Sequence, residues 1–134
     1  MCTLKRAEAT EIVLAEMAAG KRVFWKVYRR VRRGRKMVLQ SPFRHNIISG
    51  PGVIDSGRKT TRAFEVVCRA IHVLRNKQTA DNFRLRTEVV VPVLCKPEDF
   101  IAADGRDAAF RKVRLTRSEW RKATKTIPNA YSAM

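Results

Sequence analysis

A nearly continuous apolar run, Val89-Val90-Val91-Pro92-Val93-Leu94, constrains the fold of this chain more than any other segment. β-Branched side chains favour strands because they fit a pleated surface that packing covers. We therefore predict a strand over Glu88 to Cys95, in the core of a sheet. Pro92 has no backbone N–H to donate, so it favours an edge or a bulge at that position.

Other strand-like segments accompany this run, and the sheet core is expected between residues 64 and 115. Phe64 to Leu74 is apolar and β-branched, and Ala109 to Leu115 alternates apolar and basic residues. Because such runs need a covered face, they should supply most of the buried core. The residues predicted to be buried there are Ile71, Val73, Val89, Val91, Val93, Val113 and Leu115.

Three segments carry helical signals. Residues 4–19 have apolar side chains at helical spacing, Asn76 can cap a short helix that runs through Phe83, and Thr116 with Glu119 is a capping-box pattern. A chain of 134 residues is expected to form one domain. We predict an α+β fold with a mainly antiparallel sheet of four to six strands and two or three helices.

The segment 22–40 is predicted to be a basic hairpin. Val23 to Val31 alternates as a strand, with Val23, Trp25, Val27 and Val31 on one face, and Trp25 is expected in the core. Arg32-Arg33-Gly34-Arg35 gives the turn, because Gly34 can adopt a positive φ. Residues 41–62, rich in proline and glycine, are expected to form a loop, and residues 116–134 a helix followed by a tail.

The charge of the chain points to its partner. Lys and Arg number 29 against 12 Asp and Glu, a formal net charge of +17, and no acidic residue occurs from Met17 to Ile54. Such an excess costs stability through self-repulsion, and nucleic acid is the commonest polyanion that neutralises it. The residues predicted to contact nucleic acid are Lys26, Arg29, Arg30, Arg32, Arg33, Arg35, Lys36, Arg111, Lys112 and Arg114.

Arg111, Lys112 and Arg114 belong to a second basic cluster, separate in sequence from the hairpin. If their strand lies beside the hairpin, the two clusters form one groove; if it lies opposite, they do not. The sequence leaves both arrangements open.

The sequence does not reveal a catalytic site, a cofactor site or a metal site. His45 and His72 are the two imidazoles that could act as base and acid in a metal-free nuclease. His72 stands between Ile71 and Val73, where a structural role is expected, and His45 falls in the expected loop. Three widely spaced cysteines, Cys2, Cys68 and Cys95, predict free thiols rather than disulfides or zinc ligands.

Five segments form a recurring pattern of strands and one short helix, and together they cover about half of the chain: Arg69 to Leu74, the helix with Ala80, Val89 to Val93, Asp99 to Asp104 and Phe110 to Leu115. These segments resemble a family of small uncharacterised proteins of phages and large DNA viruses. The family pattern is a Gly-x-His-x-aromatic strand, a short helix, a Val-rich strand and a closing strand. Ala70 replaces the glycine and Leu74 the aromatic residue of the pattern. The resemblance implies a viral origin and an α+β sheet fold, and no established activity.

Three functions are compatible with these features. The first is a non-catalytic accessory protein that binds nucleic acid or another polyanion. The second is a structural protein of a virus particle that contacts the genome or acidic neighbours in a protein assembly. The third is a nuclease or nucleotide-binding enzyme. No secretory signal or membrane-spanning run is visible, so we expect an intracellular location, in host cytoplasm or nucleus, or a place in the virus particle.

Overall fold

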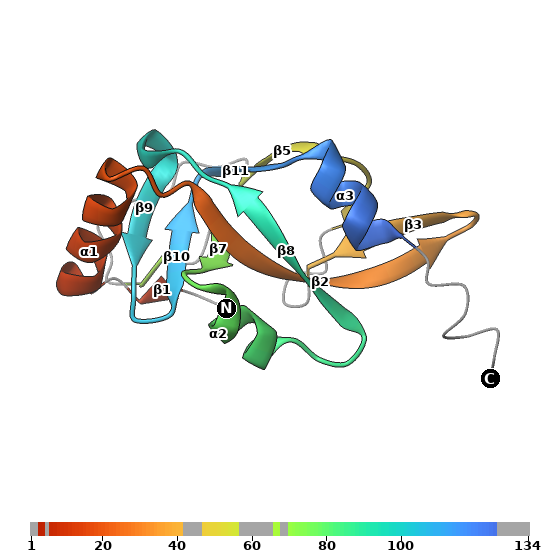
Figure 1. Cartoon of the computed structure of the whole chain (residues 1–134), viewed down its shortest axis with the longest axis horizontal. Coiled ribbons are helices and arrows are strands. Elements are labelled where there is room, and N and C mark those ends of the chain that lie inside the picture. The colour runs from red at the N-terminus through yellow and green to blue at the C-terminus, as the bar shows by residue number, and fades with distance from the viewer. Residues whose placement is uncertain (1–2, 5, 42–46, 57–65, 68–69, 126–134) are drawn as a thin grey trace.

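The computed structural model describes residues 3–4, 6–41, 47–56, 66–67 and 70–125 of the chain (Figure 1). Its helices and strands, in chain order, are β1 (Thr3–Leu4), α1 (Ala7–Ala18), β2 (Val23–Arg33), β3 (Lys36–Gln40), β4 (Ile47–Ile48), β5 (Gly52–Asp55), β6 (Val66–Val67), β7 (Ile71–Leu74), α2 (Lys77–Phe83), β8 (Glu88–Leu94), η1 (Pro97–Asp99), β9 (Phe100–Ala103), β10 (Asp107–Phe110), β11 (Lys112–Leu115) and α3 (Arg117–Thr124).

Strand β2 organises the sheet because it has different neighbours along its length. It pairs with β8 from Val23 to Arg29, with β3 from Arg29 to Arg33, and with β7 at Trp25. The tight turn into β3 is possible because Gly34 adopts a φ of 61°. Figure 1 shows the β2–β3 hairpin extending to the right, away from α1 and β9. The predicted hairpin is therefore present.

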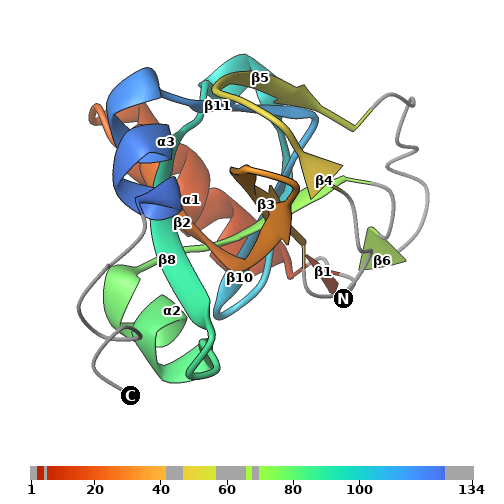
Figure 2. The same ribbon diagram turned by 90° about the vertical axis from the view of Figure 1, so that its right-hand side faces the viewer.

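The protein is a single α+β domain, as predicted, but its sheet is larger than the predicted four to six strands. In the described residues a nine-stranded sheet has the order β5-β11-β8-β2-β7-β10-β9, with β3 beside β2 and β4 beside β3. Strands β1 and β6 form a separate antiparallel pair. Figure 2 shows β4 beside β3, and β5 beside β11.

Short strands account for the difference in sheet size. The expected loop 41–62 contains β4 and β5, and β5 pairs with β11 over four residues. The expected continuous strand Ala109 to Leu115 is interrupted at Arg111, which separates β10 from β11. Strands of two to four residues show too few periods for alternation to be recognised, and their pairing partners decide their conformation.

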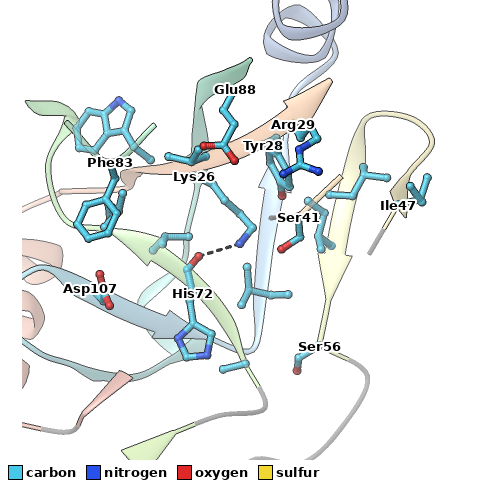
Figure 3. Close-up of a pocket in the computed structure, with 18 of the residues that line it drawn as sticks. Lys26, Tyr28, Arg29, Ser41, Ile47, Ser56, His72, Phe83, Glu88 and Asp107 are labelled. Atoms are coloured by element: carbon cyan, nitrogen blue, oxygen red, sulfur yellow. Dashed lines mark hydrogen bonds between the residues drawn. The ribbon is translucent and has the colours of Figure 1, made fainter. Parts of the chain in front are cut away.

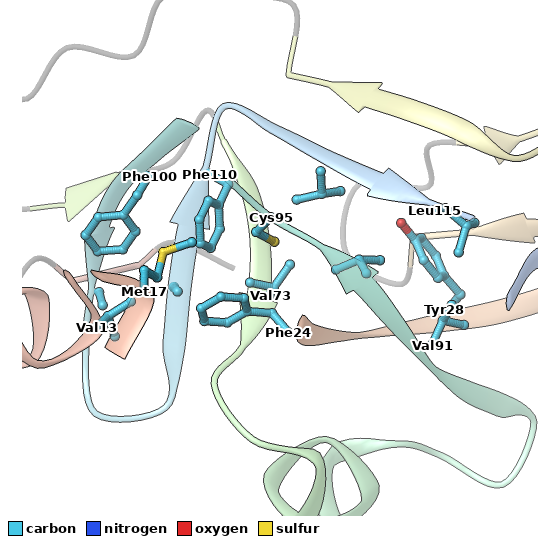
Figure 4. Packing of buried hydrophobic residues seen from close by; sticks show 14 of the residues in the cluster. Val13, Met17, Phe24, Tyr28, Val73, Val91, Cys95, Phe100, Phe110 and Leu115 are labelled. Atoms are coloured by element: carbon cyan, nitrogen blue, oxygen red, sulfur yellow. The ribbon is translucent and has the colours of Figure 1, made fainter. Parts of the chain in front are cut away.

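The core lies on one face of β2, against α1, β8, β10 and β11. Phe24 and Tyr28 are fully buried, and the Phe24 and Phe110 ring centroids are 5.0 Å apart. Figure 4 shows Phe24 and Phe110 near Met17 of α1, whereas Tyr28 lies beside Leu115.

The predicted facing of β2 was wrong. Val23 is exposed and Trp25 is half-buried, whereas Phe24, on the other face, is fully buried. Phe24 stands opposite Val93, which is also buried, so the two residues share the core face. The sequence was ambiguous because apolar side chains occupy both faces of this strand, and the aromatic pair buries more area than the valines.

The other predictions for the core were largely right. Val73, Val91, Val93, Val113 and Leu115 are buried, and the remaining two members of the set pack against them: Ile71 and Val89.

Pro92 lies in the interior strand β8, at a position that has a strand neighbour on one side only among the described residues. It stands opposite Trp25, and β8 pairs with β11 only at Leu94 in the described residues. Pro92 therefore removes no hydrogen bond from a strand pairing on that side.

The helix caps support two of the three predicted helices. The Asn76 side chain accepts a hydrogen bond from the Thr79 N–H at 2.8 Å, and Thr116 accepts one from the Glu119 N–H at 3.2 Å. The first helix was predicted over residues 4–19 but begins at Ala7, because Thr3–Leu4 form a strand.

Helix α1 protects the edge strand β9. The Thr10 hydroxyl accepts a hydrogen bond from the Ala103 N–H at 3.2 Å and lies 3.3 Å from the Ala103 carbonyl oxygen, which also accepts from the Arg6 N–H. One side chain thus satisfies the outward backbone groups of a strand that would otherwise present an open edge.

Replacing Thr10 with Val should lower the free energy of unfolding by about 1–2 kcal/mol, because the buried Ala103 N–H loses its partner while the side-chain volume is kept. Urea unfolding of wild type and variant measures the difference. Thr10→Ser keeps the hydroxyl and is the control. Equal stability of Thr10→Val and wild type would contradict the role given to this contact.

Candidate polyanion interface and adjoining cavity

The tip of the hairpin presents a compact group of bases. Arg33 stands opposite Lys36, and Arg32 opposite Met37, so the four bases at the turn surround Gly34. All four are exposed: Arg32, Arg33, Arg35 and Lys36. We call this group the hairpin tip.

The hairpin tip takes part in no ion pair among the described residues, a property that it shares with other exposed bases such as Arg111 and Arg114. In the described part of the chain, ion pairs join Lys21 and Arg75 to Glu16, Lys112 to Asp55, and Lys122 to Glu119. None of these involves the hairpin tip. Its four charges are therefore open to counterions from the solvent, and a polyanion can displace those ions.

The three predicted contact residues nearer the base of β2 have other surroundings. The Lys26 amine donates a hydrogen bond to the His72 carbonyl oxygen at 2.9 Å, and Arg29 lines a cavity. Arg30 lies on the opposite face, at a smaller hollow of about 310 Å³ that Asp81 and Glu119 also line. These residues are half-buried, so they contribute less to an exposed interface than the hairpin tip does.

The second basic cluster does not join the hairpin tip. Arg111, Lys112 and Arg114 are exposed, but β8 separates β11 from β2. Arg114 is the cross-strand partner of Leu94, and Leu94 in turn pairs with Val23 at the start of β2. The hairpin tip is at the far end of that strand, roughly 30 Å away for a strand of this length. The Lys112 amine also forms an ion pair with the Asp55 carboxylate, with 3.8 Å between Nζ and Oδ2.

The groups considered for catalysis are dispersed. His72 is half-buried on β7, with its backbone carbonyl bonded to Lys26, and His45 lies outside the described residues. Burial, together with nearby Asp99, raises the pKa of the Cys95 thiol to about 12, so this thiol is protonated and unreactive. Cys2 and Cys68 lie outside the described residues. Within them, no three His, Cys, Asp or Glu side chains gather as a metal site would require.

A cavity of about 670 Å³ opens where β7 and β3 separate from β2. On the edge of β2 that faces away from β8, β7 pairs with Trp25 and β3 pairs from Arg29 onward. Lys26 to Tyr28 have no neighbour on this edge among the described strands. Figure 3 shows the Lys26 side chain crossing this gap to reach His72. The apolar residues that line the cavity include Trp25, Val27, Ile48, Ile54, Ile71 and Val73.

Two buried polar groups stand at opposite ends of the cavity. Tyr28 and Asp107 both line it, and the Tyr28 hydroxyl and the Asp107 Oδ1 atom have no hydrogen-bond partner among the described residues. Tyr28 is at the hairpin end, since its neighbour Arg29 stands opposite Gln40. Asp107 is at the other end, opposite Leu74 of β7.

Burial sets the protonation of both groups. It raises the pKa of the Tyr28 phenol, so the hydroxyl remains a hydrogen-bond donor. Burial, with the nearby Asp104 carboxylate, raises the pKa of Asp107 to about 6, so the carboxyl is an acceptor at neutral pH. The cavity therefore offers a donor at one end and an anionic acceptor at the other.

Sequence reasoning missed this cavity. Asp107 lies outside the predicted strand Ala109 to Leu115 and was given no role, although an acid directly before Ala108-Ala109-Phe110 in an apolar segment is a signal of a functional site. Trp25 was expected in the core, and its half-burial follows from the cavity. The gap itself depends on where β7 and β3 pair with β2, which no local pattern encodes.

A scan against protein-family models found no match, and searches of curated proteins and of solved structures found no similar protein. The viral resemblance therefore stays a prediction. Among the described helices, none is both long and apolar enough to cross a membrane.

Asp107 should make stability depend on pH. Its folded-state pKa of about 6 lies above the ordinary value of 3.8, so the folded protein holds a proton that the unfolded chain has released between about pH 4 and 6. The free energy of unfolding should consequently fall as pH rises through this window. Asp107→Asn removes the effect, so the variant should gain stability relative to wild type from pH 4 upward and level off above about pH 7.

Urea unfolding of both proteins at several pH values measures this difference, in which the contributions of the other carboxyl groups cancel. A constant difference between the two proteins across the range would show that Asp107 does not titrate as stated.

Proposed function

We propose that this chain is a small basic accessory protein that binds a polyanion, with nucleic acid as the first candidate, and that it does so without catalysis. The observation that carries the proposal is the hairpin tip: four exposed bases around one glycine turn, with no ion pair in the described part of the chain.

The shape of the hairpin tip supports this role. A two-stranded ribbon is narrow enough to enter a major groove or to lie along a single strand. Arg and Lys side chains on both strands reach phosphates on either side of the turn, and Arg can bind one phosphate through two hydrogen bonds. Such contacts read charge rather than base sequence, so little sequence preference is expected.

Replacing Arg32, Arg33 and Arg35 with Gln should flatten the salt dependence of binding. Each neutralised phosphate of duplex DNA contributes a slope of roughly −0.9 in log affinity against log salt, so the triple variant should lose about two to three units of slope. The fold should survive, because these side chains are exposed at a turn. Binding titrations against DNA and RNA at several salt concentrations give the slopes.

A charge-matched control separates the hairpin tip from general attraction. Lys77, Lys96 and Arg106 are exposed and lie outside the hairpin, and changing all three to Gln removes the same number of charges. This variant should keep nearly the wild-type slope, because charges more than about 10 Å from the phosphates are largely screened at 0.1 M salt. Equal slopes for the two triple variants, or salt-insensitive binding by wild type, would reject the hairpin tip as the interface.

A further inference from the structure

The cavity adjoins the basic hairpin through one residue. Arg29 is the last β2 residue that pairs with β8 and the first that pairs with β3, and it lines the cavity. Tyr28 precedes it, and Ser41 follows Gln40, the cross-strand partner of Arg29. Figure 3 shows Tyr28, Arg29 and Ser41 on one side of the cavity. This end offers a guanidinium and two hydroxyl groups, which are donors that phosphate oxygens accept from. The Glu88 carboxylate, opposite Arg29, also lines this end, and its Oε1 atom accepts a hydrogen bond from the Leu85 N–H at 2.7 Å.

The other end of the cavity has a different chemistry. Trp25 and Phe83 line it with flat aromatic surface, and Asp107 contributes a buried carboxylate whose Oδ1 atom has no described partner. Figure 3 places Asp107 near Phe83, away from Ser41. An aromatic wall binds a planar ring by stacking, and a carboxylate accepts a hydrogen bond from an amino group on that ring.

We infer that this cavity binds a nucleotide whose base carries an exocyclic amino group, with the phosphate at Arg29, Tyr28 and Ser41 and the base toward Trp25 and Asp107. The inference extends the proposed function, since the same hairpin supplies the phosphate contact. It assigns a partner to two of the four buried polar atoms that have no hydrogen-bond partner among the described residues, the Tyr28 hydroxyl and the Asp107 Oδ1.

The size of the cavity and its position fit this ligand. A volume of about 670 Å³ is in the range of small-molecule sites, which span about 300–1,000 Å³. Lys26 adds a positive charge between the two ends: its amine lies 5.5 Å from the centre of the Tyr28 ring. The same chemistry can come from a free nucleotide or from one unstacked residue of a single strand whose other phosphates contact the hairpin tip.

A single-tryptophan protein can report on the cavity directly. Trp25 lines the cavity and Trp120 lies on α3, and these are the two tryptophans of the chain. In Trp120→Phe, fluorescence comes from Trp25 alone, so a saturable change on adding cytidine 5′-monophosphate measures occupancy of the cavity. Uridine 5′-monophosphate is the matched probe, because it replaces the amino group by a carbonyl oxygen. We expect cytidine monophosphate to bind roughly tenfold more tightly, since uridine would set an acceptor against the Asp107 carboxylate.

Two variants in this background assign the ends of the site. Asp107→Asn should abolish the preference for cytidine over uridine monophosphate, while Tyr28→Phe should weaken both probes roughly tenfold and leave their ratio unchanged. Asp81→Asn, an exposed α2 acid that does not line the cavity, should change neither. Urea unfolding confirms that each variant is folded.

A single-stranded oligonucleotide with one cytidine, compared with its abasic counterpart, tests whether the nucleotide is taken from a strand.

The outcomes separate this inference from the proposed function. Saturable binding with the stated preference, for the monophosphate or for the cytidine-bearing strand over the abasic one, supports the inference. Absence of a Trp25 response to all of these probes, or equal affinities for the two monophosphates in wild type, overturns it. The proposed function is judged independently by the salt slope of the abasic strand, which the hairpin tip alone should give.

Discussion

The pairing of β2 with β8, from Val23 opposite Leu94 to Arg29 opposite Glu88, is the interaction on which the other parts of the structure depend. It holds β2 extended over its whole first half, so Phe24 and Tyr28 reach the core while Trp25 points to the other side. The edge of β2 away from β8 pairs with β7 near its start and with β3 near its end. The cavity lies between these two strands. The hairpin tip projects because β2 continues past β8, supported there only by β3 among the described strands.

This arrangement separates the charge of the protein from its core. Phe24, Tyr28 and Phe110 are buried together with α1 and β8, whereas the bases of the hairpin tip extend beyond that core. Among the described residues no Lys or Arg is fully buried, so this part of the chain keeps its positive charge at or near the surface. The remaining self-repulsion is relieved when an anion binds, so the same charges that oppose compactness favour association with a polyanion.

Sequence reasoning predicted the elements whose signals are local. The Val-rich strand β8, the turn at Gly34 and the caps at Asn76 and Thr116 each rest on a few adjacent residues, and all four are present. It did not predict β4 and β5, which exist because of their distant partners β3 and β11. For the site, the exposed arginines of the hairpin tip were identified from the acid-free segment. Asp107 and the facing of Trp25 were missed because both depend on how β7 divides the space beside β2.

The most direct test of polyanion binding through the hairpin tip is to follow backbone amide resonances by NMR while a short single-stranded oligonucleotide is added at low salt. The amides of Arg32 to Lys36 should shift most, and raising the salt concentration should reverse the change, because phosphate contacts release counterions. Shifts concentrated on α1 and β9 instead, or no salt-reversible shifts around Gly34, would contradict the account.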